Sequence, residues 1–235
     1  MTIAAHIKHF AKKIPGLVPL SRRCGLIRGP IPHGQRGIRS AGHREYVGGL
    51  WDEIGTLQFE MMLAHGLLPH HNLCDVACGS LRGGRHFIHY LEPGRYFGID
   101  KEQPLIDAGI DHEIGPDMLA QKRPEFVLSS EFEFDRFSQQ ADYALAQSLF
   151  THLPAELIET CIRRLRKAMH PGGVFLATFF HDESGRDNPT TPHDHGRFAF
   201  TEEQMIAFGE KHGWRADYIG DWSHPRGQVL VKYTA

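Results

Sequence analysis

The chain has 235 residues, 41% of them hydrophobic, which suits one α/β domain with an extension and gives it enough residues for a large core. No run of 18 apolar residues occurs, so the sequence predicts no membrane-spanning helix. Its four cysteines form no C-x-x-C motif, a pattern typical of a reduced, cytoplasmic protein.

The net charge of −2 hides a division along the chain. Residues 1–44 hold nine Lys or Arg and no acid, whereas the remaining residues hold 17 basic and 28 acidic side chains. We therefore divide the chain into a basic amphipathic arm and linker, residues 1–44, and a folded domain, residues 45–235.

The arm begins with a predicted amphipathic helix, and residues 15–42 are predicted to be an irregular linker rich in Gly, Pro and Arg. Three interpretations stay open: the helix packs on the domain, residues 1–40 contact an anionic membrane surface, or the segment is a targeting signal. Nucleic-acid binding is not expected, because the arm has one aromatic residue and the domain is acidic. The apolar face of the helix consists of Ile3, Ile7, Phe10, Ala11 and Ile14.

The domain alternates predicted helices and strands, each inferred from the period of its apolar residues. The strands are predicted at 73–77, 95–99, 126–128, 143–146, 174–180, 214–220 and 228–234. The helices are predicted at 45–66, 82–91, 103–122 with an interruption near Gly115, 155–169 and 201–212. In the last of them Thr201 and Gln204 have the spacing of a capping box. The core face of the first consists of Leu50, Ile54, Leu57, Met61 and Ala64.

This alternation predicts a parallel sheet with helices on both faces. The last two strands are joined by only about seven residues, too few for a parallel crossover, so we expect them to form an antiparallel hairpin. The predicted fold class is therefore α/β, a doubly wound, mostly parallel seven-stranded sheet with a C-terminal antiparallel hairpin.

The most informative segment runs from Leu73 to Gly84. It reads as a strand, a glycine-containing turn and a helix start, and a second strand that ends at Asp100 follows. The turn allows a ligand close to the backbone, and an acid on the second strand can accept hydrogen bonds from both ribose hydroxyls, so the pair suits a nucleoside. The glycines at 79, 83 and 84 do not have the G-x-G-x-x-G spacing of a dinucleotide site.

The segment that starts at Asp75 resembles motif I of the class I S-adenosylmethionine-dependent methyltransferases, D-x-G-x-G-x-G. Asp75 and Gly79 match this motif, whereas Ala77 and Leu81 stand where it has glycine. The stretch 165–175 also looks like the start of strand five in that family. The resemblance covers residues 70–235 and implies a Rossmann-like methyltransferase fold with S-adenosylmethionine as cofactor.

Ligands of such sheets bind outside the carboxyl ends of the strands, which selects candidate cofactor residues. The helix start after Gly79 suits the methionine carboxylate, and Asp100 suits the ribose. The resemblance implies an acid after the third strand, beside the adenine amine, and Gln147 is a candidate for the sulfonium end. The predicted cofactor site consists of Asp75, Ala77, Gly79, Ser80, Asp100, Ser130, Glu131, Phe132 and Gln147.

His152, after the fourth strand, is the candidate general base, since a neutral imidazole can take a proton from a hydroxyl near pH 7. The alternative is a histidine that caps or packs the following helix.

Other side chains are expected at the same edge. The candidate acceptor-binding residues are His181, His224, Arg226 and Trp51, the last of which is alternatively a core residue. His193 and His195, with Asp194 between them, could hold a divalent metal, but loop histidines at this spacing are more often solvated, and we predict no metal.

The sequence thus predicts an S-adenosylmethionine-dependent methyltransferase that acts on a small or sugar-like polar acceptor. Oxygen is the expected methylated atom, because polar loops with histidines suit a hydroxyl group. Two alternatives stay open. One is an NAD(P)-dependent oxidoreductase on a related sheet, which the glycine spacing and the terminal hairpin disfavour. The other is a non-catalytic module that binds the cofactor.

Overall fold

The computed structural model describes residues 31–32, 34–184, 187–194 and 196–235. The predicted helix of the basic arm lies outside these ranges, as does most of the segment 1–40 for which a membrane contact is predicted. Within the part of the chain that is described, no helix is long and apolar enough to cross a membrane.

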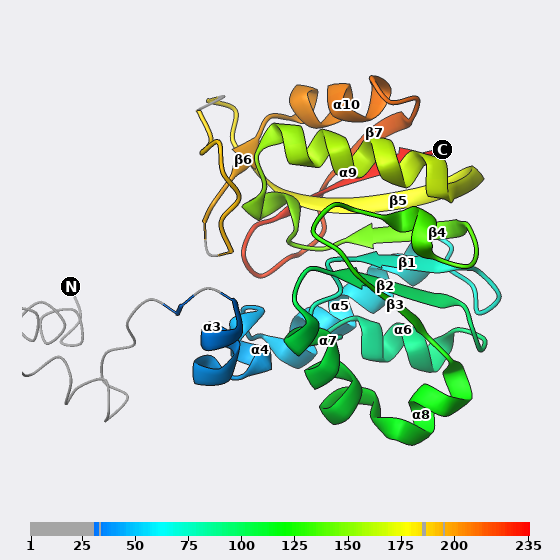
Figure 1. Cartoon of the computed structure of the whole chain (residues 1–235). Helices are drawn as coiled ribbons and strands as arrows, with labels where there is room; N and C mark the ends of the chain where they lie inside the picture. The colour runs from blue at the N-terminus through cyan, green and yellow to red at the C-terminus, as the bar shows by residue number, and fades with distance from the viewer. Residues whose placement is uncertain (1–30, 33, 185–186, 195) are drawn as a thin grey trace, which may run out of the picture.

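A central sheet has the strand order β3-β2-β1-β4-β5-β8-β7 (Figure 1). All neighbours pair in parallel except β8, which is antiparallel to both β5 and β7. A short extra strand, β6 (Ala199–Phe200), pairs with the end of β5. The doubly wound sheet with its C-terminal hairpin confirms the predicted fold. The strands are β1 (Leu73–Val76), β2 (Tyr96–Asp100), β3 (Glu125–Leu128), β4 (Ala141–Ala146), β5 (Met169–His181), β7 (Arg215–Asp221) and β8 (Val229–Thr234).

Helices cover both faces of the sheet, with α9 and α10 on one side and α5, α6 and α8 on the other (Figure 1). Phe175 and Leu176, consecutive on β5, belong to the two separate apolar clusters that these layers form, as the alternation of side chains along a strand requires. The helices are α5 (Trp51–Ala64), α6 (Gly84–Tyr90), α7 (Gln103–Gly109), α8 (Gly115–Lys122), α9 (Ala155–Ala168) and α10 (Glu202–Glu210), with a π-helical turn at Ile110–Ile114.

The helix predicted at 45–66 begins later than expected. Gly48 and Gly49 both have positive φ and Leu50 is left-handed and 42% exposed, so the regular helix starts at Trp51. The buried face of this helix also differs from the predicted one: Ala64 is exposed, whereas Gln58 is buried. The predicted core face was therefore wrong at Leu50, which precedes the helix, and at Ala64, which is exposed in its last turn.

Residues 34–46 are helical where the sequence predicted irregular structure through residue 42. They form α3 (Gly34–Ala41) and α4 (His43–Tyr46), and Ile38 and Tyr46 pack on Leu105 of α7. Arg44 also donates to the carboxylate of Glu113 at 2.8 and 2.9 Å. These contacts hold the segment against the domain, beside the carboxyl edge of the sheet.

Candidate functional site

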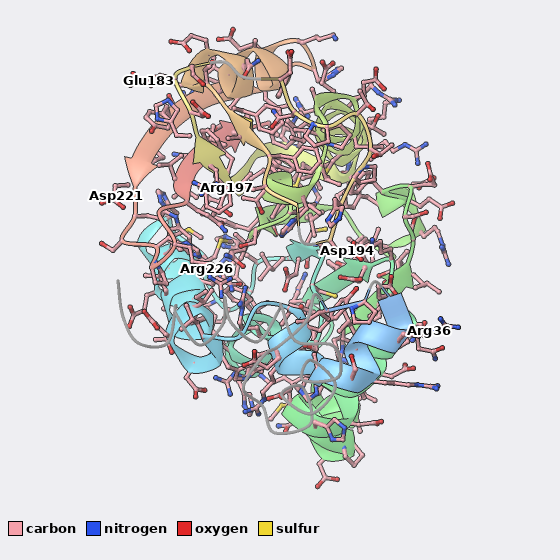
Figure 2. All side chains as sticks on the ribbon, turned by 90° about the vertical axis from the view of Figure 1, so that its left-hand side faces the viewer. Arg36, Glu183, Asp194, Arg197, Asp221 and Arg226 are labelled. Atoms are coloured by element: carbon pink, nitrogen blue, oxygen red, sulfur yellow. The ribbon has the colours of Figure 1, made fainter. Side chains whose placement is uncertain are left out.

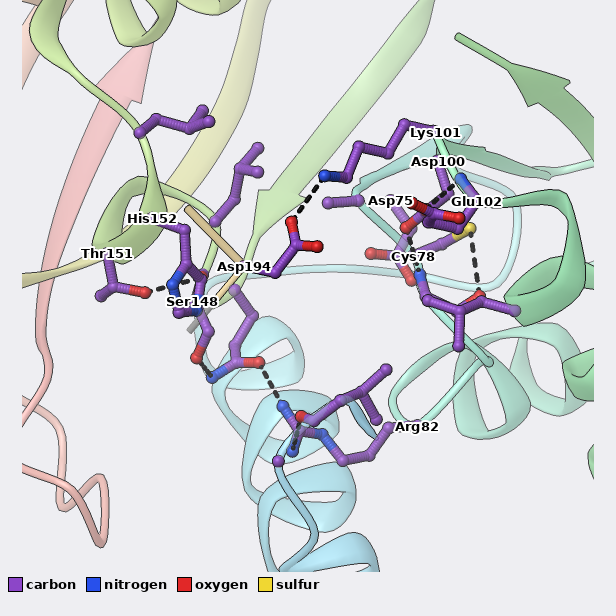
Figure 3. Close-up of a pocket in the computed structure, with 18 of the residues that line it drawn as sticks. Asp75, Cys78, Arg82, Asp100, Lys101, Glu102, Ser148, Thr151, His152 and Asp194 are labelled. Atoms are coloured by element: carbon purple, nitrogen blue, oxygen red, sulfur yellow. Dashed lines mark hydrogen bonds and ion pairs between the residues drawn. The ribbon is translucent and has the colours of Figure 1, made fainter. Parts of the chain in front are cut away.

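A cavity of about 490 Å³ lies at the carboxyl ends of β1, β2 and β4. Its floor is the turn after β1, and its walls include Tyr46–Gly48 before α5 and residues 192–194 of the loop after β5. Figure 3 shows the charged side chains that line it. Residues far apart in the sequence thus enclose the edge at which a doubly wound sheet binds its ligands.

The turn after β1 has a left-handed backbone at every second residue. The φ angles are +61° at Ala77, +55° at Gly79 and +67° at Leu81. These are the three glycine positions of the D-x-G-x-G-x-G motif, so the turn keeps the geometry of the motif even where the residue is not glycine. An L-residue in this region costs roughly 1–2 kcal/mol, and complete burial of the Leu81 side chain offsets this cost at one position.

Asp100 at the end of β2 is held against this turn. Its Oδ2 accepts a hydrogen bond from the backbone N–H of Gly79 at 2.9 Å, and its Oδ1 accepts one from the N–H of Glu102 at 2.9 Å. The side chain lines the cavity but is buried, and burial raises its pKa. Each oxygen keeps a second lone pair, so the carboxylate can accept from two ribose hydroxyls as well.

Asp75 lies beneath the turn. Its Oδ2 accepts a hydrogen bond of 2.7 Å from the hydroxyl of Tyr96, and burial raises its pKa to about 6. Asp75 therefore ties β1 to β2 under the cavity floor.

The other end of the cavity is basic and centres on Arg82, which the sequence analysis did not select. The side chain is 7% exposed, and burial lowers its pKa to about 10, with Arg226 adding to the effect. Its Nη1 donates to the carbonyl oxygens of Val47 and Gly49 and its Nη2 to Gln147 Oε1 at 2.8 Å. Arg82 is a charged residue among small and apolar residues directly after the turn, and this sequence signal could have revealed its role.

His152 follows β4, in the single helical turn Phe150–His152, and lines the cavity. Its Nδ1 lies 3.0 Å from the carbonyl oxygen of Gly196. A carbonyl oxygen only accepts, so this contact assigns the proton of the neutral ring to Nδ1 and makes Nε2 the basic nitrogen.

The structure brings most, but not all, of the predicted site residues to the cavity. Those that line it are Asp75, Ala77, Gly79, Ser80, Asp100, Ser130, Phe132, Gln147, His152 and Arg226. Those that do not are Glu131, Trp51, His181 and His224.

The four remaining residues have other surroundings. Glu131 is exposed at the end of β3, Trp51 is buried under the guanidinium of Arg44 at 4.9 Å, and His181 packs on Tyr218. His224 is buried behind the wall, 3.2 Å from Gln147, and burial with the nearby arginines lowers its pKa to about 4. Two of them still contact a side chain that lines the cavity: His224 lies beside Gln147, and Glu131 accepts a hydrogen bond from Ser130 at 3.4 Å.

The loop after β5 reaches across to the N-terminal segment. The carboxylate of Asp194 accepts a hydrogen bond from the Tyr46 hydroxyl at 3.0 Å and pairs with Lys101 at 2.6 Å. Figure 2 shows Asp194 and Arg226 near the centre of the same face of the molecule. Among the residues described, no three His, Cys, Asp or Glu side chains are placed to hold a metal ion. His195 lies outside that set.

No protein-family model matches the chain, but solved structures share its fold. Magnesium protoporphyrin IX methyltransferase from Synechocystis, with bound S-adenosylmethionine, is 13% identical with a TM-score of 0.56, over 100% of this chain and 98% of that one. Human N-acetylserotonin methyltransferase, also with the cofactor, is 13% identical with a TM-score of 0.62, over 91% and 61% of the two chains. The glycopeptide N-methyltransferase MtfA is 14% identical with a TM-score of 0.60, over 78% and 91%. The chain therefore has the Rossmann-like fold of class I S-adenosylmethionine-dependent methyltransferases.

Proposed function

We propose that the protein is an S-adenosylmethionine-dependent methyltransferase that acts on a small polar acceptor. The proposal rests on the position of Asp100. A hydrogen bond with the backbone N–H of Gly79 fixes its carboxylate beside a turn whose three motif positions all have positive φ. This combination presents a carboxylate for a ribose and open backbone for the methionine part. Solved structures of the same fold that contain the cofactor support this assignment.

The lining residues suit the cofactor chemically. Asp100 and Glu102 supply carboxylates where the ribose would bind, and the apolar side chains of Leu105 and Phe132 suit an adenine ring beside them. Ser80 Oγ is buried with no protein partner, so it has a free hydrogen-bonding group on the cavity wall. When bound, the cofactor supplies a methyl group that its positively charged sulfur already activates.

The protein has three tasks in such a transfer. It aligns donor and acceptor, keeps water out and removes one proton. The Tyr46–Asp194 contact closes one side of the cavity against water. We assign proton removal to Nε2 of His152, whose ring is oriented by the carbonyl of Gly196. A histidine base suits a hydroxyl acceptor, so we place methylation at oxygen.

Calorimetric titration with S-adenosylhomocysteine, S-adenosylmethionine and NADH tests the proposal. We expect both adenosyl compounds to bind with one site per chain and NADH not to bind. Incubation with S-adenosylmethionine and a panel of sugars and phenols should then release S-adenosylhomocysteine with at least one acceptor. Binding of NADH without binding of S-adenosylhomocysteine would contradict the proposal and favour the oxidoreductase.

A further inference from the structure

The basic end of the cavity holds two guanidinium groups with no carboxylate in contact among the described residues, although the charge of Asp75 acts on Arg82 from a greater distance. Arg82 and Arg226 both line the cavity, and neither has a carboxylate oxygen within 4 Å among the residues described. Elsewhere in the cavity, Lys101 pairs with Asp194, and Asp100 accepts two backbone N–H groups. Arg82 and Arg226 are therefore basic groups of the cavity that lack an ion pair among the described residues.

The hydrogen bonds of Arg82 go to neutral oxygens, so they do not pair its charge, and they use only part of its donor capacity. Three of its five N–H groups reach neutral oxygens, those of Val47, Gly49 and Gln147. The Nε–H is buried and has no acceptor in the part of the chain that the structure describes. Burial of an unpaired guanidinium costs several kcal/mol unless a counter-charge is supplied. An anionic ligand in the cavity supplies that counter-charge.

Arg226 reaches the same place from the hairpin between β7 and β8. Its Nη2 donates to the carbonyl oxygen of Gly48, next to the segment that Arg82 also contacts. Gly48 has a φ of +99°, which favours glycine, and a Cβ there would stand 2.7 Å from Arg226 Nη1, so a larger residue would displace the guanidinium. The positive charge of Arg226 also contributes to the lowered pKa of Arg82.

The basic end is separate from the proposed ribose end. Figure 3 shows Arg82 on the opposite side of the pocket from Asp100, Lys101 and Glu102. Gln147, which accepts from Arg82, lies directly after β4, the same edge that carries His152. Arg82 is therefore linked through Gln147 to the strand end that leads to His152.

We propose that the methyl acceptor carries a carboxylate or phosphate group, which Arg82 and Arg226 bind at this end of the cavity. The inference rests on the proposed function and adds the class of substrate. Guanidinium groups present paired N–H donors that match the oxygens of both anions, so either anion satisfies the site. The amino-acid carboxylate of the cofactor has the same chemistry, and the experiment must separate the two sources.

The first arm measures binding without turnover. Protein saturated with S-adenosylhomocysteine is titrated with inorganic phosphate at constant ionic strength, and Arg226→Gln is compared with Arg163→Gln on the exposed face of α9. We expect about a tenfold loss of phosphate affinity in the Arg226 variant only, because a charge-assisted pair is lost. Equal phosphate binding in the two variants, or none in the wild type, would overturn the proposal.

The second arm separates the two sources of the anion. S-adenosylhomocysteine and 5′-methylthioadenosine, which lacks the amino-acid part, are titrated into the wild type, Arg82→Gln and Arg226→Gln. We expect the affinity of both compounds to change less than about twofold. If S-adenosylhomocysteine alone becomes about tenfold weaker, the arginines hold the carboxylate of the cofactor and the proposal is wrong. If neither compound binds the wild type, the proposed function itself fails.

The third arm tests substrate choice. Release of S-adenosylhomocysteine is compared for galacturonate against galactose and for 4-hydroxybenzoate against 4-hydroxybenzamide. We expect the acid of at least one pair to be preferred about tenfold or more, Arg226→Gln to reduce this preference, and Arg163→Gln to keep it. Equal turnover of acid and neutral partner in both pairs would overturn the proposal. Thermal unfolding of Arg82→Gln verifies that this buried substitution leaves the protein folded, and Arg226→Gln, at an exposed position, carries the test if it does not.

Discussion

The carboxylate of Asp100 accepts a hydrogen bond from the backbone N–H of Gly79 at 2.9 Å. This bond joins the end of β2 to the turn after β1, 21 residues earlier in the chain. It fixes the carboxylate and the left-handed turn as one unit, so that neither needs to reorganise when a nucleoside binds. Preorganisation of this kind lowers the cost of binding.

Replacing Asp100 with Asn should weaken binding of S-adenosylhomocysteine by about tenfold or more, because hydrogen bonds to a charged group are worth about 1.5–3 kcal/mol each. The amide keeps one oxygen for the N–H of Gly79, so the fold should persist. Calorimetry measures the affinity, and the matching change Asp117→Asn on the exposed surface of α8 should leave it unaltered. An unchanged affinity in folded Asp100→Asn would remove Asp100 from the site.

Ala77 has a left-handed φ of +61°, from which we predict how substitutions at this position change the stability of the protein. Ala77→Val should lower the free energy of unfolding by about 2 kcal/mol or more, since a β-branched residue is strongly disfavoured in this region. Ala77→Gly should change it by less than about 1 kcal/mol, because relief of strain opposes the greater entropy of the unfolded chain.

Urea denaturation measures both changes, and Ala207 in α10 is the control. At this exposed helical position the order should reverse, with Gly costing more than Val. If Val is tolerated at position 77 as well as Gly, the turn does not have the left-handed conformation described above.

His152→Ala should lower turnover by roughly 10²–10⁴, the usual contribution of a general base. Affinity for S-adenosylhomocysteine should barely change, because the imidazole is assigned to the acceptor. The wild-type pH–rate profile should show an acid limb that the variant lacks. His181→Ala, outside the cavity, should keep both the rate and the limb. A variant His152→Ala with normal turnover would mean that this histidine only caps the helix that follows.

Asp75 should make the protein less stable as the pH rises from about 4 to about 7. Burial raises its pKa from 3.8 to about 6, so the unfolded chain releases this proton more readily than the folded one. The stability that it contributes is complete below pH 3.8 and is lost as the pH rises through 6, by about 3 kcal/mol in total at about 1.4 kcal/mol per unit.

The substitution Asp75→Asn isolates this effect. The amide can still accept from Tyr96, and the variant should be more stable than the wild type at pH 7.5, with the difference shrinking between pH 6 and pH 4. Denaturation at a series of pH values measures it, with Asp117→Asn as an exposed control. A difference that does not vary with pH would mean that the carboxyl of Asp75 is not shifted by burial.

Local patterns in the sequence predicted the sheet and much of the cofactor side of the cavity. The apolar runs fixed the strands, and the short connection before β8 required a hairpin, because a parallel crossover needs more residues. The capping box of Thr201 and Gln204 is present at the start of α10, since both partners lie within one helical turn. Asp75, Gly79 and Asp100 meet because each follows or ends a parallel strand at one edge.

The basic end of the cavity was decided only by the tertiary structure. Arg82 is buried because Val47 and Gly49 fold back over it, and Arg226 arrives from a hairpin more than a hundred residues later. Likewise His181 and Glu131, at strand ends that suggested the site, do not line the cavity. Sequence periodicity determines which residues reach the edge of the sheet, whereas long-range packing determines which of them share a cavity and which charges remain unpaired there.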